Sequence, residues 1–94
     1  MFYFYVLYSL KDNRLYKGAT SNLLRRLQQH NAGGTRSTKH RRPLILLYFE
    51  EYAEQSAALS RERWSKSLEG GAALRELLKS AGLLNEEGQI NLPG

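Results

Sequence analysis

Four side chains in the first third of this sequence have the types and spacing needed to handle a phosphate group. Tyr5 and Tyr16 lie in two aromatic stretches that a polar turn separates, and Arg26 and His30 stand four residues apart. On a helix that spacing places the guanidinium and the imidazole on one face. Two phenols, a guanidinium and an imidazole could orient water, bind a phosphoryl oxygen and move a proton. The alternative is that both tyrosines pack a small core, that Arg26 is solvated and that His30 caps a helix.

A β-hairpin followed by a helix would bring these side chains together. The run 2–10 is almost continuously apolar and aromatic, 11–13 has turn-forming Asp and Asn, and 14–19 returns as the second strand. Thr20 or Ser21 can supply the N-terminal cap of the helix that follows. The sequence therefore predicts that the two tyrosines lie on neighbouring strands and that the helix begins directly after them.

This first helix is expected to end near Asn31 and to be amphipathic. Its predicted buried stripe consists of three leucines, Leu23, Leu24 and Leu27. Arg25 and Gln29 point away from that stripe, whereas Arg26 and His30 occupy its shoulder. A shoulder position is partly buried but reaches solvent, so it suits a side chain that works on a ligand at the edge of the core.

The rest of the chain predicts a basic loop, a third strand and two further helices. In order, these are the loop 32–43, the strand 44–52 and the helices 53–68 and 72–81. The Gly70-Gly71 pair is expected to end the second helix, and Gly82 the third. The fold class predicted is α+β, with a small, mainly antiparallel three-stranded sheet flanked by three helices. Residues 1–82 form one domain in this interpretation, and 83–94 a C-terminal tail.

Positive charge is concentrated in the middle of the chain. The net charge is +5, and between Arg25 and Arg42 there are six Lys or Arg residues, two His and no acid. Such a distribution favours a polyanionic partner, although an exposed, soluble loop would look the same. The candidate nucleic-acid contacts are Lys17, Arg25, Arg36, Lys39, His40, Arg41 and Arg42. Ser37 and Thr38 could add hydroxyl contacts.

Two features of the composition exclude some classes of site and location. The sequence has no cysteine, so disulfides and thiolate metal sites are excluded and any metal must use oxygen or imidazole ligands. The apolar N-terminal run is about eight residues long, too short to cross a membrane, and no basic segment precedes it. We expect a cytoplasmic protein with no membrane association.

Five elements of the sequence, taken in order, resemble the GIY-YIG endonuclease superfamily, and in particular its small stand-alone single-domain members. The elements are Tyr3-Phe4-Tyr5, Tyr16-Lys17-Gly18, Arg26, His30 and Glu62. The resemblance covers residues 2–68. Tyr3-Phe4 stands where Gly-Ile would be expected, and Lys17 replaces the middle residue of the second motif. Asn85 and Asn91 lie in no recognisable motif, so neither is assigned the role of the asparagine that many of these nucleases carry.

The resemblance implies a role for each residue of the predicted site. Tyr5 would be the general base, with its pKa lowered by the Arg26 guanidinium, and Tyr16 would position water or phosphate beside it. Arg26 would hold the scissile phosphate. His30 would orient a phosphate or protonate the leaving group. Glu62 would bind a single divalent ion, Mg²⁺ or Mn²⁺.

The function predicted is metal-dependent DNA endonuclease activity, a hydrolysis used in DNA repair or recombination. Cutting would be guided by DNA structure, by a targeting protein or by a second copy of the chain, because no recognition domain is attached. No small-molecule cofactor is expected. Two alternatives stay open: a catalytically inactive nucleic-acid-binding module of the same fold, and a small interaction protein that docks through the third helix or the tail.

Overall fold

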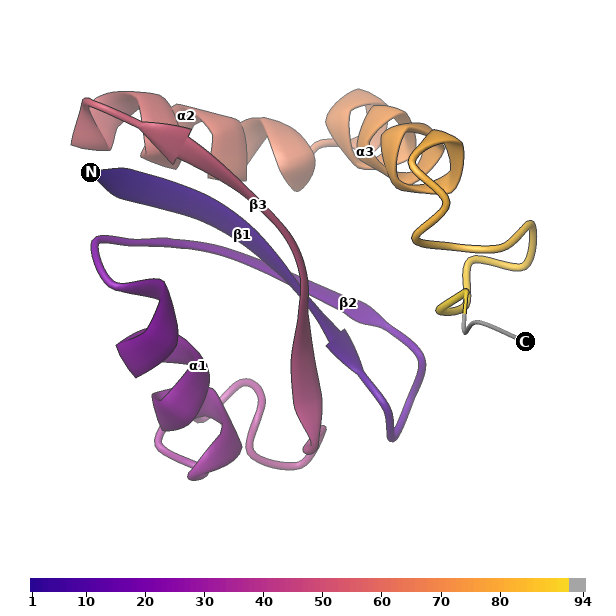
Figure 1. The fold of residues 1–94 in the computed structure, drawn as a ribbon, viewed down its shortest axis with the longest axis horizontal. Helices are drawn as coiled ribbons and strands as arrows, with labels where there is room; N and C mark the ends of the chain where they lie inside the picture. Colours follow the sequence, from indigo (N-terminus) through magenta and orange to yellow (C-terminus); the bar gives the residue numbers. More distant parts are fainter. Residues whose placement is uncertain (92–94) are drawn as a thin grey trace.

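The central sheet has three strands and is antiparallel throughout, in the computed structural model, which describes residues 1–91 (Figure 1). Strand β1 (Phe2–Ser9) lies in the middle, between β2 (Leu15–Thr20) and β3 (Leu44–Tyr52). The hairpin turn contains Asn13 at φ 60°, a left-handed conformation that Asn tolerates. The predicted α+β class, the antiparallel sheet and the bounds of the third strand are confirmed.

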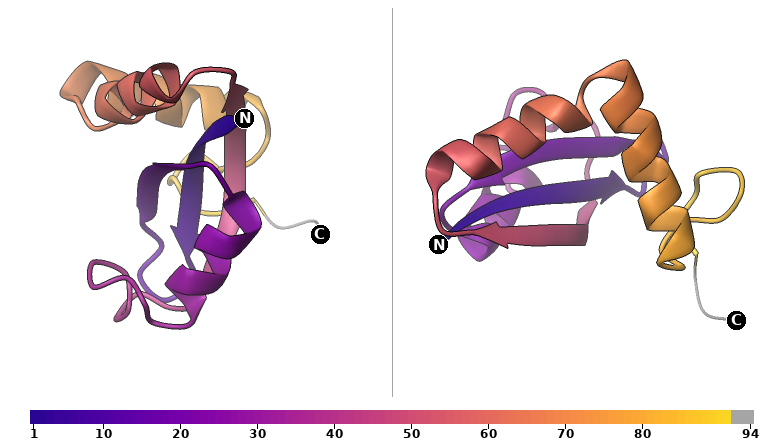
Figure 2. Two further views of the ribbon diagram at one scale, coloured as in Figure 1. Left: turned by 90° about the vertical axis from the view of Figure 1, so that its left-hand side faces the viewer. Right: turned by 90° about the horizontal axis from the view of Figure 1, so that it is seen from above.

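Helices cover both faces of the sheet. Figure 2 shows α1 (Leu23–Asn31) on one side and α2 (Gln55–Ser65) with α3 (Leu68–Ser80) on the other. Because successive side chains of a strand point to opposite faces, the central strand β1 contributes to two separate cores. The sheet therefore has no solvent-exposed face at β1, which explains why its sequence is apolar without alternation.

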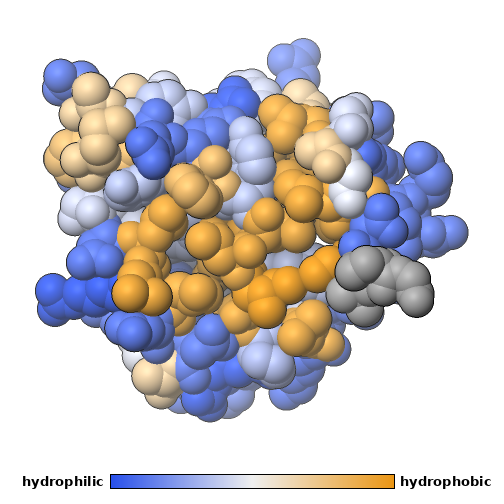
Figure 3. Space-filling model, in the orientation of Figure 1, coloured by the Kyte–Doolittle hydropathy of each residue, from blue (hydrophilic) through white to orange (hydrophobic). Residues whose placement is uncertain are grey.

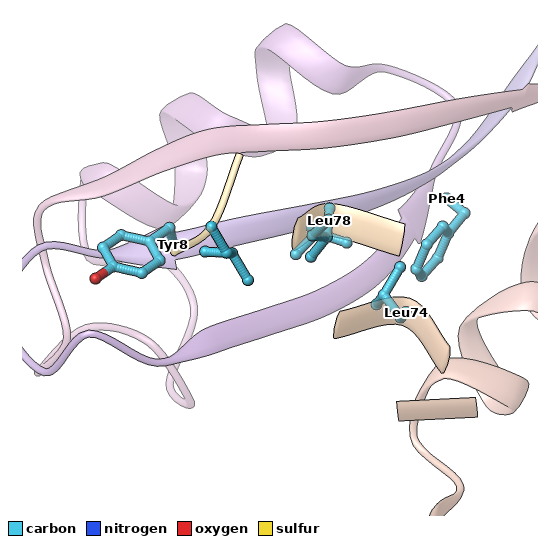
Figure 4. Packing of buried hydrophobic residues seen from close by; sticks show 6 residues of the cluster. Phe4, Tyr8, Leu74 and Leu78 are labelled. Atoms are coloured by element: carbon cyan, nitrogen blue, oxygen red, sulfur yellow. The ribbon is translucent and has the colours of Figure 1, made fainter. Parts of the chain in front are cut away.

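The larger core lies between the sheet and α3. Its fully buried members include Phe4 and Tyr8 from β1 and Leu74 and Leu78 from α3, which Figure 4 shows packed together. The smaller core lies under α1 and contains three buried residues, Tyr5, Leu7 and Leu44. The phenol of Tyr5 is thus buried on the α1 face.

The start and the buried stripe of α1 differ from the prediction. The cap is Asn22 rather than Thr20 or Ser21, because the Asn22 side chain accepts a hydrogen bond of 3.0 Å from the Arg25 amide. Leu24 is 67% exposed, so its place in the predicted stripe was wrong. Leu24 lies about 100° around the helix from its neighbour Leu23. The one fully buried residue of α1 is His30.

The junction between α2 and α3 also differs from the prediction. Gly70 and Gly71 do not end α2; they lie in the first turn of α3, whose N-terminal cap is Ser67. A Cβ on Gly70 would lie 1.8 Å from the carbonyl oxygen of Trp64, so only glycine permits this approach between the helices. Gly82 follows α3 at φ 77°, as the predicted terminator should.

Helix α2 is attached to β3 through the carboxylate of Glu50. That carboxylate accepts hydrogen bonds from the hydroxyls of Tyr48 and Tyr52 and two from the guanidinium of Arg61, at 2.9 and 3.1 Å. The Arg61 guanidinium also lies 3.8 Å from the ring centre of Trp64. Although burial alone would raise the pKa of Glu50, the hydrogen bonds from Arg61 and the two tyrosines lower it.

The long connection 32–43 is closed at its base by Asn31. The side-chain Nδ2 of Asn31 donates to the Leu44 carbonyl, and its side-chain Oδ1 accepts from the backbone N–H of Leu44, both at 2.8 Å. In the tail, Leu84 is buried against the larger core and pairs with Ile90. The predicted division between 1–82 and 83–94 stays a prediction, and the last three residues of that tail lie outside the described part of the chain.

The surface on the β3 side is notably apolar. Figure 3 shows hydrophobic residues gathered across the middle of this face. Phe49, on the outer strand, is 45% exposed. No helix within residues 1–91 has both the length and the apolar character needed to cross a membrane.

Candidate active site

The candidate site begins with the packing of Tyr5 on Gly18. These two residues are paired across β1 and β2, so their side chains would point to the same face of the sheet. A Cβ on Gly18 would lie only 2.4 Å from the Tyr5 hydroxyl oxygen and 2.5 Å from its Cζ. The phenol therefore lies directly over the glycine, and the glycine of the second motif is needed to make room for the tyrosine of the first.

Arg26 lies within hydrogen-bond reach of the Tyr5 hydroxyl. Its Nε donates to the phenolic oxygen at 3.4 Å, and its Nη1 donates to Oε1 of Gln29 at 3.2 Å. Gln29 was predicted to point away from the core, and this was wrong, because the side chain is half-buried and holds the guanidinium. The hydrogen bond that Arg26 donates to Tyr5 is the main reason that the pKa of Arg26 is raised. Arg26 is thus a fixed cation beside the phenol.

His30 connects Tyr5 to the basic loop. Its Nε2 lies 3.1 Å from the Tyr5 hydroxyl, and its Nδ1 lies 2.8 Å from Oγ1 of Thr38. The hydroxyl of Thr38 is aimed at the carbonyl of Thr35, so we assign the Nδ1 proton to a bond that His30 donates to Thr38. Nε2 is then the acceptor for the Tyr5 hydroxyl. The ring of Tyr16 packs edge-on against the same imidazole, with ring centres 4.9 Å apart.

The environment of His30 contradicts the predicted shoulder position. The side chain has no exposed surface, and burial, followed by the charge of Arg26, lowers the pKa of His30 to about 4. A neutral imidazole at pH 7 is suited to accept a hydrogen bond from Tyr5. Direct protonation of a leaving group would require a charged His30 and is disfavoured at that pH.

The pKa of Tyr5 also departs from the prediction. Burial raises it, and the hydrogen bond and charge of Arg26 only partly offset that effect. The expectation that Arg26 gives Tyr5 a net lowered pKa was therefore wrong. The charge of Glu62 contributes to the same rise, which places Glu62 within electrostatic range of the phenol.

Among the described residues of this site, Glu62 is the carboxylate that a metal ion could use, in competition with Lys66. It projects from α2, its side chain is 24% exposed, and Lys66 donates to its Oε2 at 2.8 Å. Within residues 1–91, no three side chains of the His, Cys, Asp or Glu type come together. Mg²⁺ often binds through one carboxylate and keeps most of its waters, so a single Glu fits this ion better than a metal that needs several protein ligands.

A polar hollow adjoins the guanidinium of Arg26. It lies at the junction of β2 and α1, and its lining residues are Ala19, Thr20, Ser21, Asn22, Arg25, Arg26 and Gln29. Figure 1 shows this junction at the end of β2, where the chain turns into α1. A phosphate in the hollow would contact Arg26 on the side that Tyr5 does not occupy.

Comparison with known proteins identifies the chain. A family model described as the GIY-YIG catalytic domain matches residues 1–71. The chain belongs to the GIY-YIG family. A UPF0213 protein of Pediococcus pentosaceus is 44% identical over 80 residues, covering 84% of this chain and 83% of that protein. A UPF0213 protein of Clostridium perfringens is 40% identical over 95 residues, covering 98% of this chain and all of that protein.

Membership of the GIY-YIG family indicates a nuclease, with a nucleic acid as substrate. In this GIY-YIG domain the elements quoted from the sequence come from four places in the chain, namely β1, β2, α1 and α2. The structure brings Tyr5, Tyr16, Arg26 and His30 into one cluster, with Glu62 in electrostatic range. Their individual roles stay proposals.

Two of the residues predicted to contact nucleic acid, Lys17 and Arg41, make hydrogen bonds within the protein. Lys17 is half-buried and its ammonium donates to the Ser65 carbonyl at the end of α2, at 3.1 Å. Arg41 pairs with Asp12 at 2.9 Å and donates to the carbonyl of Leu15. A phosphate would have to compete with these partners. Both side chains therefore stabilise the fold as it stands.

The other predicted contacts are exposed. Arg25 lines the hollow beside Arg26, and Arg36 lies on the surface of the loop. Lys39, His40 and Arg42 line a separate surface hollow at the end of the loop, away from Arg26. Their accessibility is compatible with binding to a phosphate backbone.

The sequence interpretation missed the role of Thr38. We expected its hydroxyl to contact a ligand, and this was wrong, because Thr38 is fully buried and accepts from His30. No periodic pattern marks such a residue, since it reaches the core from an irregular loop. Its signal is indirect: a buried histidine whose Nε2 meets Tyr5 needs a second partner for Nδ1.

Proposed function

We propose that this chain is a divalent-metal-dependent DNA endonuclease in which Tyr5, Arg26 and Glu62 act on one phosphodiester bond. The observation that carries the proposal is the hydrogen-bonded set of Arg26, Tyr5 and His30, packed over Gly18. A phenol buried between a guanidinium and a neutral imidazole is costly to assemble for packing alone, because each buried polar group must be satisfied.

In this mechanism Arg26 binds the scissile phosphate. Its Nε and Nη1 are occupied by Tyr5 and Gln29, so its remaining N–H groups are directed to the phosphoryl oxygens. The two internal hydrogen bonds fix the plane of the guanidinium before the substrate arrives. A preorganised cation of this kind stabilises the additional charge of the transition state and has little reorganisation to undergo.

Tyr5 would take the proton from the attacking water, and His30 would position it for that step. Only the phenolate can act as this base, so the Tyr5 proton, which points to Nε2 of the neutral His30, would first pass to that nitrogen or to solvent, and the phenolate oxygen would then accept the proton of the water. The negative charge of Glu62 contributes to the raised pKa of Tyr5. A divalent cation bound at Glu62 would reverse the sign of that charge, so it would lower the pKa of Tyr5 and ease loss of the phenolic proton. Tyr16, beside the imidazole, would orient the water.

The cutting would be guided by DNA structure, by a targeting protein or by a second copy rather than by base sequence. Two hollows in the described part of the chain are lined by Arg, Lys, His and short polar side chains, which are suited to binding phosphates. Contacts of that type position a nucleic acid without reading its bases.

The test is a cleavage assay on linear, flap and branched DNA, with and without Mg²⁺ or Mn²⁺. Arg26→Ala should reduce the rate by roughly a hundredfold or more, and Glu62→Gln should abolish the metal-dependent activity. Arg63→Ala is the matched control, because Arg63 is an exposed helix arginine next to Glu62 and its loss removes the same charge. Cleavage that survives both active-site substitutions would identify a contaminant.

A non-catalytic nucleic-acid-binding module is the second candidate. It is favoured by the ion pair between Glu62 and Lys66, which occupies the carboxylate that the metal needs. Binding of DNA by the wild type without cleavage of any substrate, at any metal concentration tested, would establish this alternative.

A further inference from the structure

A second basic hollow lies at the opposite end of β2 from Arg26. It is formed where β2, α3 and the tail meet, and it is lined by four cations, Arg14, Lys17, Arg75 and Lys79. Two carboxylates of the tail, Glu86 and Glu87, also line it, so the charged lining residues have a net charge of +2. The hollow has a volume of about 470 Å³. That is within the range of small-molecule pockets, so a phosphate with part of its sugar would fit.

The cations of this hollow outnumber its two carboxylates, and most of them make no direct ion pair. No carboxylate oxygen lies within 4.0 Å of the side-chain nitrogens of Arg14, Lys17 or Arg75 in the described part of the chain, and Lys79 has only a 3.6 Å pair with Glu76. Burial lowers the pKa of Lys17, and the positive charges of Arg75 and Lys66 lower it further. Like charges gathered in this way repel one another, and a bound anion would remove that repulsion.

The packing of α3 fixes the position of these cations. A Cβ on Gly71, near the start of α3, would lie 3.9 Å from the ammonium of Lys17, an ordinary van der Waals distance, so the Lys17 side chain reaches the start of α3. The Lys17 ammonium in turn donates to the Ser65 carbonyl. Arg75 lies one turn further along α3 and is exposed. The arginine is therefore placed near Lys17 by a helix rather than by a loop.

The edge strand β2 connects this hollow to the candidate active site. Figure 1 shows β2 extending from the side of α3 and the tail to the start of α1. From Leu15 to Thr20 the strand advances about 17 Å, at roughly 3.4 Å a residue. A nucleic-acid strand in a duplex advances about 3.4 Å per nucleotide. The length of β2 thus corresponds to about five base-pair steps along the axis of a duplex.

We propose that the hollow between β2, α3 and the tail binds a backbone phosphate of the DNA, on either strand, about five base-pair steps along the duplex axis from the bond held at Arg26. This inference rests on the proposed function. Arg75 and Arg14 contact the phosphate, and Lys17 supplies charge while it keeps α2 attached to β2. The hollow sets the register of the duplex on the enzyme and makes affinity depend on the length of the DNA.

The test compares Arg75→Glu with Arg63→Glu, which change the net charge equally at two exposed helix positions. Fluorescence anisotropy without divalent metal measures the binding of two hairpin duplexes, one of about six base pairs and one of about eighteen. The short duplex, centred on Arg26, cannot reach the second hollow. Circular dichroism and thermal melting confirm that each variant is folded.

Arg75→Glu should weaken binding of the long duplex about tenfold and leave the short duplex unchanged. The slope of log K against log salt for the long duplex should also become shallower in this variant, by about 0.9 for each phosphate contact that is lost. Arg63→Glu should affect both duplexes equally and weakly. Equal effects of the two variants on the long duplex, with cleavage by the wild type intact, would overturn the second hollow and leave the proposed function standing. Wild type that neither binds nor cuts DNA would overturn both.

Discussion

Substitution of Gly18 by alanine tests the contact on which the candidate site is built. The new Cβ would lie 2.4 Å from the Tyr5 hydroxyl oxygen, whereas an ordinary contact is 3.4 Å or more. The phenol must therefore retreat by about 1 Å. It cannot do so freely, because Tyr5 is only 2% exposed and its hydroxyl is bonded to Arg26 and His30.

The expected cost of Gly18→Ala has two parts. Overpacking of a filled core costs roughly 1–3 kcal/mol. A shift of the hydroxyl away from its partners, now at 3.1 and 3.4 Å from it, stretches at least one of these bonds beyond 3.5 Å, and a lost buried hydrogen bond costs about 1 kcal/mol. The sum, about 3 kcal/mol of unfolding free energy, corresponds to a fall in Tm of roughly 10–20 °C for a domain of this size.

The assay is urea denaturation followed by circular dichroism, with DNA cleavage measured in parallel. A double-mutant cycle with Tyr5→Leu provides the control, because the shorter side chain leaves space for the new methyl group. In that background Gly18→Ala should cost less than about 1 kcal/mol. An equal cost in both backgrounds would show that the Tyr5 contact is not the cause, and an unchanged cleavage rate would refute the link to activity.

Three further predictions concern stability. The pKa of His30 is lowered to about 4 in the folded chain from 6.5 in the unfolded chain, so the unfolded chain binds the extra proton first. The free energy of unfolding should therefore fall as the pH drops from 6.5 to 4, by roughly 3 kcal/mol. The urea midpoint of the wild type should fall as the pH is lowered through this range. The same fall in His30→Gln would show that His30 is not its cause. Glu50→Ala should destabilise by about 3 kcal/mol in thermal melts, because it leaves the Arg61 guanidinium without its partner. Asn31→Ala should cost about 2 kcal/mol and increase hydrogen exchange at the Leu44 amide; unchanged exchange would exclude the clamp.

The strands and the hairpin were predictable because their patterns are local. The apolar run of β3 was placed at Leu44–Tyr52 from its composition alone, and the turn at Asn13 has the chemistry that a left-handed residue requires. The third helix was predicted from its leucine spacing, and Leu74 and Leu78 are indeed buried. In each case the sequence signal and the structural cause lie within a few residues of each other.

The misses depend on contacts between distant parts of the chain. Gly70 was predicted to end α2, but it lies inside α3. A glycine is required there because a Cβ would collide with the carbonyl oxygen of Trp64. His30 was placed on a shoulder, since the helical pattern does not show that Tyr5 and Thr38 enclose its ring from both sides. The candidate site itself was assembled from a resemblance in motif order, and Glu62 has no sequence signal of its own.

The clamp between Asn31 and Leu44 separates the loop 32–43 from the strands and helix that carry Tyr5 and Arg26. Because the two ends of 32–43 are held together by a pair of 2.8 Å bonds, a longer insertion would be tethered at both sides and would cost chiefly loop-closure entropy, roughly 0.6 kcal/mol for each doubling of its length. As long as Thr38 still reaches His30, the exposed positions of the segment can be exchanged one by one. A new preference for one shape of substrate can therefore be acquired there while the geometry of Tyr5 and Arg26 stays as it is.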